Sequence, residues 1–225
     1  MNGFLFGTVP YILFAVALVG GVRRFGAARE TVTTYSSQLL EARLQYWGAV
    51  SWHYGILAVL LLHLCAIFLP GALETLLSAP GRLLMVELSG FALGLTALVG
   101  LLVLVGRRFV LRGRTTWLDW TVMALLLVQV GTGLWIAVTA RWGFAWFTRA
   151  ATPWLASLLT LSPRVDLVEN LPVAFKLHAL NALVLVALVP FTRLAHALVV
   201  PAQYLWRLPQ VVVWRRPRPT EGGVR

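Results

Sequence analysis

Apolar residues along this chain gather into five long stretches that polar residues rarely interrupt. The stretches cover about 4–22, 49–70, 88–106, 120–140 and 177–200. Each is long enough to cross a bilayer as an α-helix, which takes about 20 residues. We therefore expect an all-α integral membrane protein, built as a bundle of five transmembrane helices.

Little sequence remains outside these stretches for a soluble domain. Of the 225 residues, 59% are hydrophobic and only 12% are charged, whereas a soluble domain averages about 25% charged residues. We expect residues 1–201 to form one membrane domain and residues 202–225 to form a basic cytoplasmic tail. The Trp-rich connection at about 141–176 is expected to lie on the membrane surface.

The net charge of +11 comes from basic residues placed between the apolar stretches. Thirteen arginines follow the first, third and fifth stretches, and five basic residues lie in the other connections. Connections rich in Lys and Arg stay in the cytoplasm, so we expect the N-terminus outside and the C-terminus inside. This distribution indicates membrane lipid as the surroundings and argues against a nucleic-acid partner.

The chain has four histidines, and all of them lie in the second and fifth stretches: His53, His63, His178 and His196. These two helices run in opposite directions under the predicted topology. His53 and His196 then lie toward the cytoplasm, and His63 and His178 lie toward the outside. Eighteen residues make five whole helical turns, so His178 and His196 should face the same way on one continuous helix.

Each cross-helix pair of histidines can supply the two axial ligands of a haem iron. We therefore expect the bundle to enclose two haems, one above the other. A zinc or copper site is less expected, because the ligand spacings typical of such sites do not occur. Two other interpretations stay open: histidines hydrogen-bonded within the bundle, and a proton relay in a transporter. A relay would be expected to include intramembrane acids, whereas the acids here fall in connections or at span ends.

Arg193 lies within the fifth stretch, three residues before His196. A charge in a membrane helix must be paired or must reach the headgroups. We expect Arg193 either to meet a carboxylate, such as a haem propionate, or to extend to the cytoplasmic headgroups.

Two segments carry a resemblance to a known family. One runs from SSQLLEARLQYW through His53 and His63, and the other contains KLHALN, PFTRLAH and PAQYLWR around His178 and His196. With the two histidine spacings, they resemble the gamma, or cytochrome b, subunit of respiratory membrane-bound nitrate reductase over essentially the whole chain. The resemblance implies an outer haem on His63 and His178 and an inner haem on His53 and His196, the same pairs that the topology predicts.

The resemblance also implies a function. The chain would be the quinol-oxidising subunit of a nitrate reductase complex of anaerobic respiration, in the cytoplasmic (inner) membrane of a prokaryote. Electrons from menaquinol or ubiquinol would pass through the two haems to an iron–sulfur beta subunit. A molybdenum-containing alpha subunit would then reduce nitrate. The same plan could serve another reductase, for example in sulfur metabolism.

The candidate quinol site lies at the start of the third apolar stretch. The resemblance places a lysine there, but this chain has Leu83 at that position and Arg82 beside it. We expect Arg82 to hydrogen-bond a quinone oxygen and Glu87 to accept a proton from quinol. Lys176, two residues before His178, is expected to meet a propionate of the outer haem or to extend to the headgroups.

Overall fold

A computed structural model describes residues 2–27, 43–110, 116–140 and 147–197, and no strand occurs in these ranges. Five helical segments within them are long and apolar enough to cross a membrane, which confirms the expected five-span all-α plan. The chain divides into two compact units, residues 1–195 and 196–225. The fold described below is that of the first unit, and the predicted tail at 202–225 lies outside the described residues.

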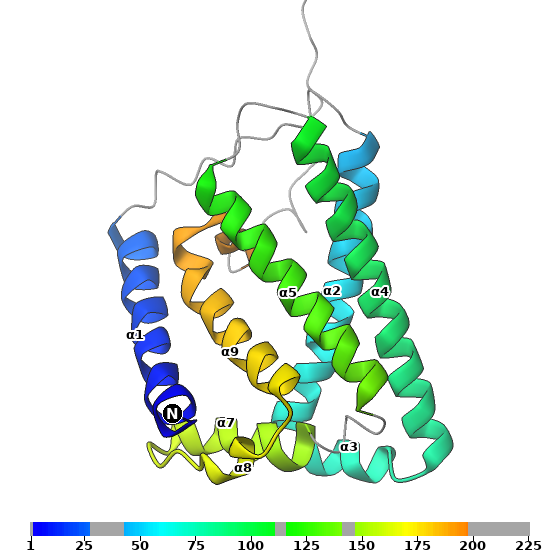
Figure 1. Ribbon diagram of the computed structural model, residues 1–225, viewed down its shortest axis with the longest axis vertical. Helices are drawn as coiled ribbons and strands as arrows, with labels where there is room; N and C mark the ends of the chain where they lie inside the picture. The colour runs from blue at the N-terminus through cyan, green and yellow to red at the C-terminus, as the bar shows by residue number, and fades with distance from the viewer. Residues whose placement is uncertain (1, 28–42, 111–115, 141–146, 198–225) are drawn as a thin grey trace, which may run out of the picture. The chain divides into compact units, whose positions relative to one another are not determined.

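The five spans are built on five α-helices with short irregular extensions. These are α1 (Val9–Val22), α2 (Arg43–Phe68), α4 (Pro80–Val110), α5 (Trp117–Thr139) and α9 (Val173–Leu188). The first span begins with the π-helix η1 (Phe4–Thr8) and continues into η2 (Arg23–Ala27). The helices α2 and α4 pack together, α4 packs on α5, α5 on α9, and α9 on α1 (Figure 1).

Glycines let α2 and α4 approach until their backbones touch. A Cβ atom added at Gly100 would lie 2.3 Å from the backbone nitrogen of Trp52, and one at Gly55 would lie 2.6 Å from that of Ala97. Any larger residue at these positions would push the helices apart, and small residues at such contacts are typical of helix packing in membranes. The helix that carries His53 and His63 is therefore held directly against the backbone of α4.

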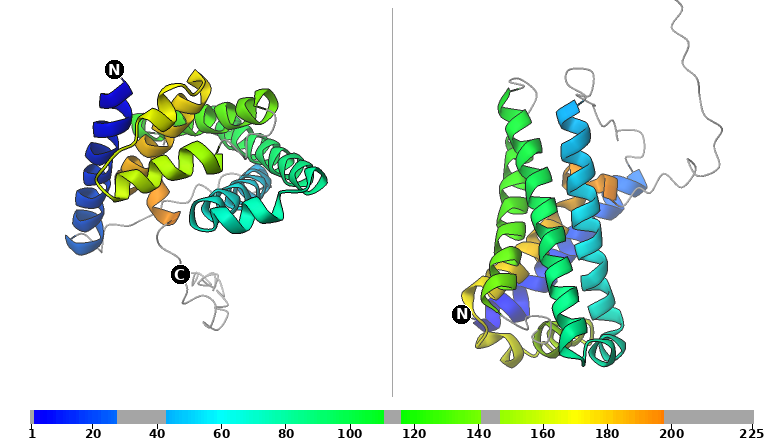
Figure 2. Two further views of the ribbon diagram at one scale, coloured as in Figure 1. Left: turned by 90° about the horizontal axis from the view of Figure 1, so that it is seen from below. Right: turned by 90° about the vertical axis from the view of Figure 1, so that its right-hand side faces the viewer.

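Short helices close one end of this unit. They are α3 (Pro70–Leu76), η4 (Phe147–Ala151), α7 (Thr152–Leu159) and α8 (Asp166–Glu169). Seen from below, α7 crosses beneath the spans near the start of α1 (Figure 2). The indole N–H of Trp154, which is 2% exposed, donates to the Phe6 carbonyl at 3.0 Å. The Trp-rich connection thus contributes core residues, beyond the surface location that its sequence predicts.

The fifth span departs from the sequence prediction. The helix α9 ends at Leu188, where the 3₁₀-helix η5 (Val189–Phe191) begins, and Thr192 is extended at φ −125° and ψ 179°. Pro190 has no N–H to donate, so a regular helix cannot continue through it. The prediction of one continuous helix from His178 to His196 is therefore wrong. The same-face geometry derived from eighteen residues does not hold.

Two side chains donate hydrogen bonds to backbone carbonyls that this break leaves without a helical partner. The Arg24 guanidinium donates to the Pro190 carbonyl at 2.7 Å, and the Thr192 hydroxyl donates to the Leu188 carbonyl at 2.9 Å. A buried carbonyl without a donor would cost free energy in an apolar bundle. The end of the first span is therefore attached to the break in the fifth.

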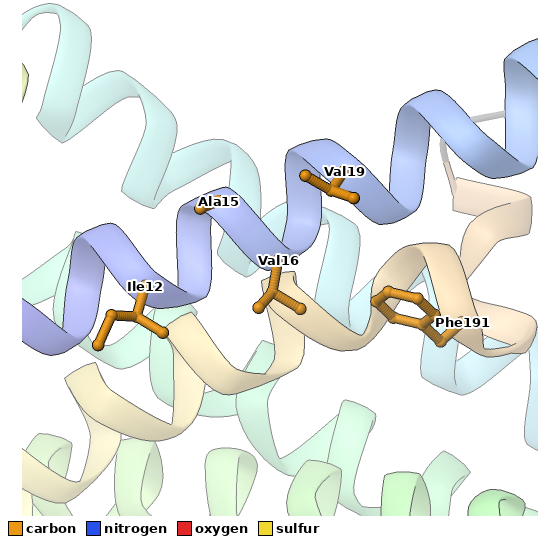
Figure 3. A pocket seen from close by; sticks show the side chains of 5 residues that line it. All are labelled: Ile12, Ala15, Val16, Val19 and Phe191. Atoms are coloured by element: carbon orange, nitrogen blue, oxygen red, sulfur yellow. The ribbon is translucent and has the colours of Figure 1, made fainter.

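An open apolar groove lies between α1 and η5 (Figure 3). It is lined by Ile12, Ala15, Val16, Val19 and Phe191. All five side chains are hydrocarbon, so the groove offers no hydrogen bond to a quinol headgroup. Its chemistry suits an acyl chain of the surrounding lipid.

Candidate functional site: facing histidines of two spans

The rings of His63 on α2 and His178 on α9 face each other. Their centroids are 6.5 Å apart and their planes are tilted by 31°. With metal–nitrogen bonds of about 2 Å and ring centres about 1 Å beyond each nitrogen, two imidazoles on opposite sides of one iron have centres roughly 6 Å apart. The spacing fits two axial ligands of a haem, and these are the two residues that we expected to form the outer pair.

The two histidines of α2 are oriented by their own helix. Nδ1 of His53 lies 2.7 Å from the Ala49 carbonyl, and Nδ1 of His63 lies 2.8 Å from the Val59 carbonyl. A carbonyl can only accept, so each Nδ1 carries the ring proton and donates it. In a neutral ring this leaves Nε2 unprotonated, which is the form that binds a metal.

His178 is held by side chains of other residues. Its Nδ1 lies 3.0 Å from the Thr132 hydroxyl, and its Nε2 lies 3.1 Å from the amide nitrogen of Gln129. Asn181, which is buried, donates to the Gln129 side-chain oxygen at 2.7 Å. Sequence reasoning missed these three residues. Their signal was polarity within apolar spans, where polar side chains usually have a function or a partner.

Two close neighbours shape the space around the pair. Phe147 meets the His63 ring edge-on, with centroids 5.2 Å apart. A Cβ atom added at Gly133 would lie 3.1 Å from Cε1 of His178. A larger residue at position 133 would therefore press on the imidazole ring.

The two histidines of the predicted inner pair belong to different compact units. His53 belongs to the first compact unit, and His196 belongs to the second. His196 lies in the 3₁₀-helix η6 (Arg193–Ala197). Its pairing with His53 stays a prediction.

Arg193 meets a carboxylate of the protein itself. Its Nε lies 3.1 Å from Asp119 Oδ1, and Arg108 Nη1 lies 3.4 Å from Asp119 Oδ2. Asp119 also closes the capping box of α5, in which its carboxylate accepts from the Thr116 N–H at 3.1 Å. One carboxylate thus joins the end of the fifth span to α4 and α5. Contact of Arg193 with a haem propionate stays a prediction.

The candidate quinol residues Arg82 and Glu87, and Lys176 as the candidate partner of a haem propionate, differ in how their polar groups are bonded. Arg82 donates to the Leu76 carbonyl at the end of α3, and the Lys176 ammonium donates to the Glu169 carbonyl at 2.5 Å. Glu87 on α4 has a buried carboxylate oxygen that no donor among the described residues contacts. Of the three, Glu87 is the residue with a buried side-chain oxygen that lacks a donor among the described residues.

Packing places Glu87 near the depth of the outer histidines. Gly90 lies one turn away on α4, and a Cβ atom added there would lie 3.8 Å from the side chain of Leu62 on α2. Leu62 is the residue before His63. The antiparallel packing of the two helices therefore puts Glu87 within about a turn of His63 along the bundle.

The described ranges contain no group of three or more His, Cys, Asp or Glu side chains able to hold a metal ion. A haem needs only two protein ligands, because its macrocycle supplies the other four. The fold defines a multi-pass helical membrane protein in which histidines of two spans lie close together. The chain matches the nitrate reductase gamma subunit family over residues 2–215 and belongs to that family, which confirms the resemblance seen in its sequence.

Individual relatives agree with this assignment. The chain is 34% identical over 217 residues to the nitrate reductase-like protein NarX of Mycobacterium tuberculosis, and the match covers 92% of this chain and 33% of NarX. It therefore spans about a third of that relative's length. It is 29% identical over 220 residues to the nitrate reductase gamma chain of Bacillus subtilis, covering 94% of this chain and 97% of the relative. It is also 29% identical over 218 residues to the respiratory nitrate reductase 1 gamma chain of Escherichia coli, with the same coverage.

Proposed function

We propose that this chain is the di-haem cytochrome b subunit of a quinol-dependent nitrate reductase in a prokaryotic cytoplasmic membrane, with its N-terminus outside. It would oxidise quinol near the outer face and pass electrons inward. The observation that carries the proposal is the spacing of His63 and His178, 6.5 Å between ring centroids, in a chain of the nitrate reductase gamma subunit family.

The residues present fit two haem b groups. His63 and His178 would hold the outer one, and His53 and His196 would hold the inner one. Haem bound at these positions supplies one-electron transfer. The chain would contribute histidine ligands at two depths of the membrane. On α2, hydrogen bonds to backbone carbonyls orient the imidazole rings and leave each Nε2 free of a proton. The apolar spans would keep water away from the haems.

Partners must complete the reaction, because nitrate reduction is proposed to take place on another subunit. The relatives in Bacillus subtilis and Escherichia coli are named as gamma chains of nitrate reductases. We infer an iron–sulfur beta subunit as the electron acceptor and a molybdenum-containing alpha subunit beyond it. Arg108 and Arg193 lie at the end of the spans that the arginine distribution places in the cytoplasm, where such an acceptor would bind.

We expect membranes that contain the tagged chain to show b-type haem in a reduced-minus-oxidised spectrum. Purification in mild detergent should recover larger partner subunits, and added nitrate should reoxidise quinol-reduced haem. A variant that lacks both His63 and His178 is the control. Absence of haem from the wild-type chain would refute the proposal. Reoxidation by a sulfur compound but not by nitrate would assign the chain to a different reductase.

Glu87→Gln should lower quinol oxidation by about 10²-fold or more, the usual contribution of a general base. The amide cannot take a proton from quinol, while its size is unchanged. Arg82→Ala should have a smaller effect on quinol oxidation, because the Arg82 guanidinium already donates to the Leu76 carbonyl at the end of α3. The measurement is steady-state quinol oxidation per haem, and Glu74→Gln on exposed α3 is the matched control. Normal turnover in both variants, with both haems present, would place the quinol site elsewhere.

A further inference from the structure

Four polar side chains form one continuous hydrogen-bonded chain between α5 and α9. The Asn181 amide donates to the Gln129 oxygen at 2.7 Å and to the Leu125 carbonyl at 3.0 Å. These two bonds fix which end of the Gln129 amide carries its nitrogen. That nitrogen then faces the ring of His178.

The hydroxyl of Thr132 determines where the ring proton of His178 lies. It has one hydrogen, and it lies 2.7 Å from the Val128 carbonyl and 3.1 Å from the Gln129 carbonyl, both of which can only accept. The hydroxyl therefore donates to its own helix and turns a lone pair toward His178. Nδ1, which lies 3.0 Å away, must be the donor.

The other ring nitrogen follows from this assignment. With the proton on Nδ1, a neutral His178 has an unprotonated Nε2, which accepts from the Gln129 amide at 3.1 Å. The Gln129 amide nitrogen also lies 3.3 Å from Nδ1. Both groups are donors there, so the amide bonds to Nε2 and the contacts of Asn181, Gln129, His178 and Thr132 agree with a single tautomer. It is the tautomer that presents Nε2 to an iron.

His178 differs in this respect from His53 and His63. Their Nδ1 atoms donate to backbone carbonyls of α2, which no substitution removes. His178 bonds instead to a different helix, α5, where the Thr132 hydroxyl is an acceptor that a substitution can remove. The hydrogen bonding of one proposed axial ligand therefore depends on the residue type at position 132.

We propose that Thr132 is a positioning residue for His178, which fixes its tautomer and, with haem bound, would set the electron density that its imidazole gives to the iron. This inference rests on the proposed function. An acceptor on the far ring nitrogen raises the basicity of a ligating imidazole. A more basic ligand favours ferric over ferrous iron, so loss of the acceptor raises the reduction potential of that haem only.

The test is a potentiometric titration of both haems in membranes, with Thr132→Val, which removes the acceptor at nearly constant shape. The outer haem is identified as the component lost in His63→Ala. We expect its potential to rise by about 59 mV for each tenfold loss of ferric relative to ferrous affinity, while the inner haem keeps its potential. Thr132→Ser, which retains a hydroxyl, should restore the wild-type value. Thr121→Val is the matched control, because that exposed hydroxyl of α5 donates to the Trp117 carbonyl and to no histidine.

The outcomes separate this inference from the proposed function. Absence of haem from the wild-type chain would refute both the proposed function and the role of Thr132. Two bound haems with unchanged potentials in Thr132→Val would overturn the inference and leave the proposed function intact. Should Thr132→Val lose the outer haem, its recovery in Thr132→Ser would support the role of the hydroxyl. Continued loss in Thr132→Ser would contradict that role.

Discussion

Replacing His178 with alanine should remove one of the two proposed b-type haems and stop electron entry from quinol. The imidazole is one of two proposed axial ligands, and the methyl group of alanine cannot replace it. The haem content per chain should fall from two to one. Low-spin signals in electron paramagnetic resonance would count the bis-imidazole centres, and quinol-dependent reduction of the remaining haem would be lost.

The other three histidines provide the comparison. His63→Ala should remove the same haem as His178→Ala, because the two rings face each other. His53→Ala and His196→Ala should remove the inner haem and leave the outer one reducible by quinol. A single variant that retains two low-spin haems would show that the ligand assignment is wrong.

Gly100→Val should separate α2 from α4 and lower the content of both haems together. Even one Cβ atom at this position would lie 2.3 Å from the Trp52 backbone nitrogen, so a helix must move. Overpacking of this kind costs about 1–3 kcal/mol, and contact with backbone places the cost at the upper end. Because α2 carries both His53 and His63, one displacement disturbs both sites. Thermal unfolding in detergent and haem content measure the effect.

Gly106→Val on the same helix is the control for this experiment. A Cβ atom added at Gly106 would meet nothing within 4 Å. Both substitutions place a β-branched residue in α4 and so share its effect on helix propensity. Equal stability of the two variants would show that the close approach at Gly100 is not required.

The five spans could be read from the sequence because hydrocarbon demands about 20 apolar residues in each. The ends of the spans were predicted less accurately. The third span was expected at 88–106, whereas α4 runs from Pro80 to Val110. Polar residues outside the apolar stretch continue the helix, since the backbone hydrogen bonds do not stop where the hydropathy falls.

The fifth span shows the limit of a hydropathy pattern. Val189, Pro190 and Phe191 are as apolar as the residues before them, so the stretch reads as continuous. The proline ends the helix through its missing donor, which apolarity does not report. The sequence therefore predicted where the chain crosses the membrane but not the conformation in which it reaches His196.

The outer histidine pair was predictable and its supporting residues were not. Opposite helix directions were enough to bring His63 and His178 to the same end. Two of the supporting contacts, Thr132 with His178 and Asp119 with Arg193, join residues that lie far apart in the chain. The helices that carry such residues can pack through several different faces. Only the packing of α5 on α9 selects one of these faces.

Among the described spans, the first in chain order packs chiefly on the fifth. Helix α1 lies against α9 and η5, and Phe6 of its N-terminal extension pairs with Trp154. During translation, α1 must therefore reside in the bilayer without these partners until the chain has been synthesised through α9 and η5, which end at Leu188 and Phe191. It can do so because a lone helix satisfies its own backbone in lipid. Closure of this part of the bundle is consequently a late event in biogenesis, whatever the order of membrane insertion.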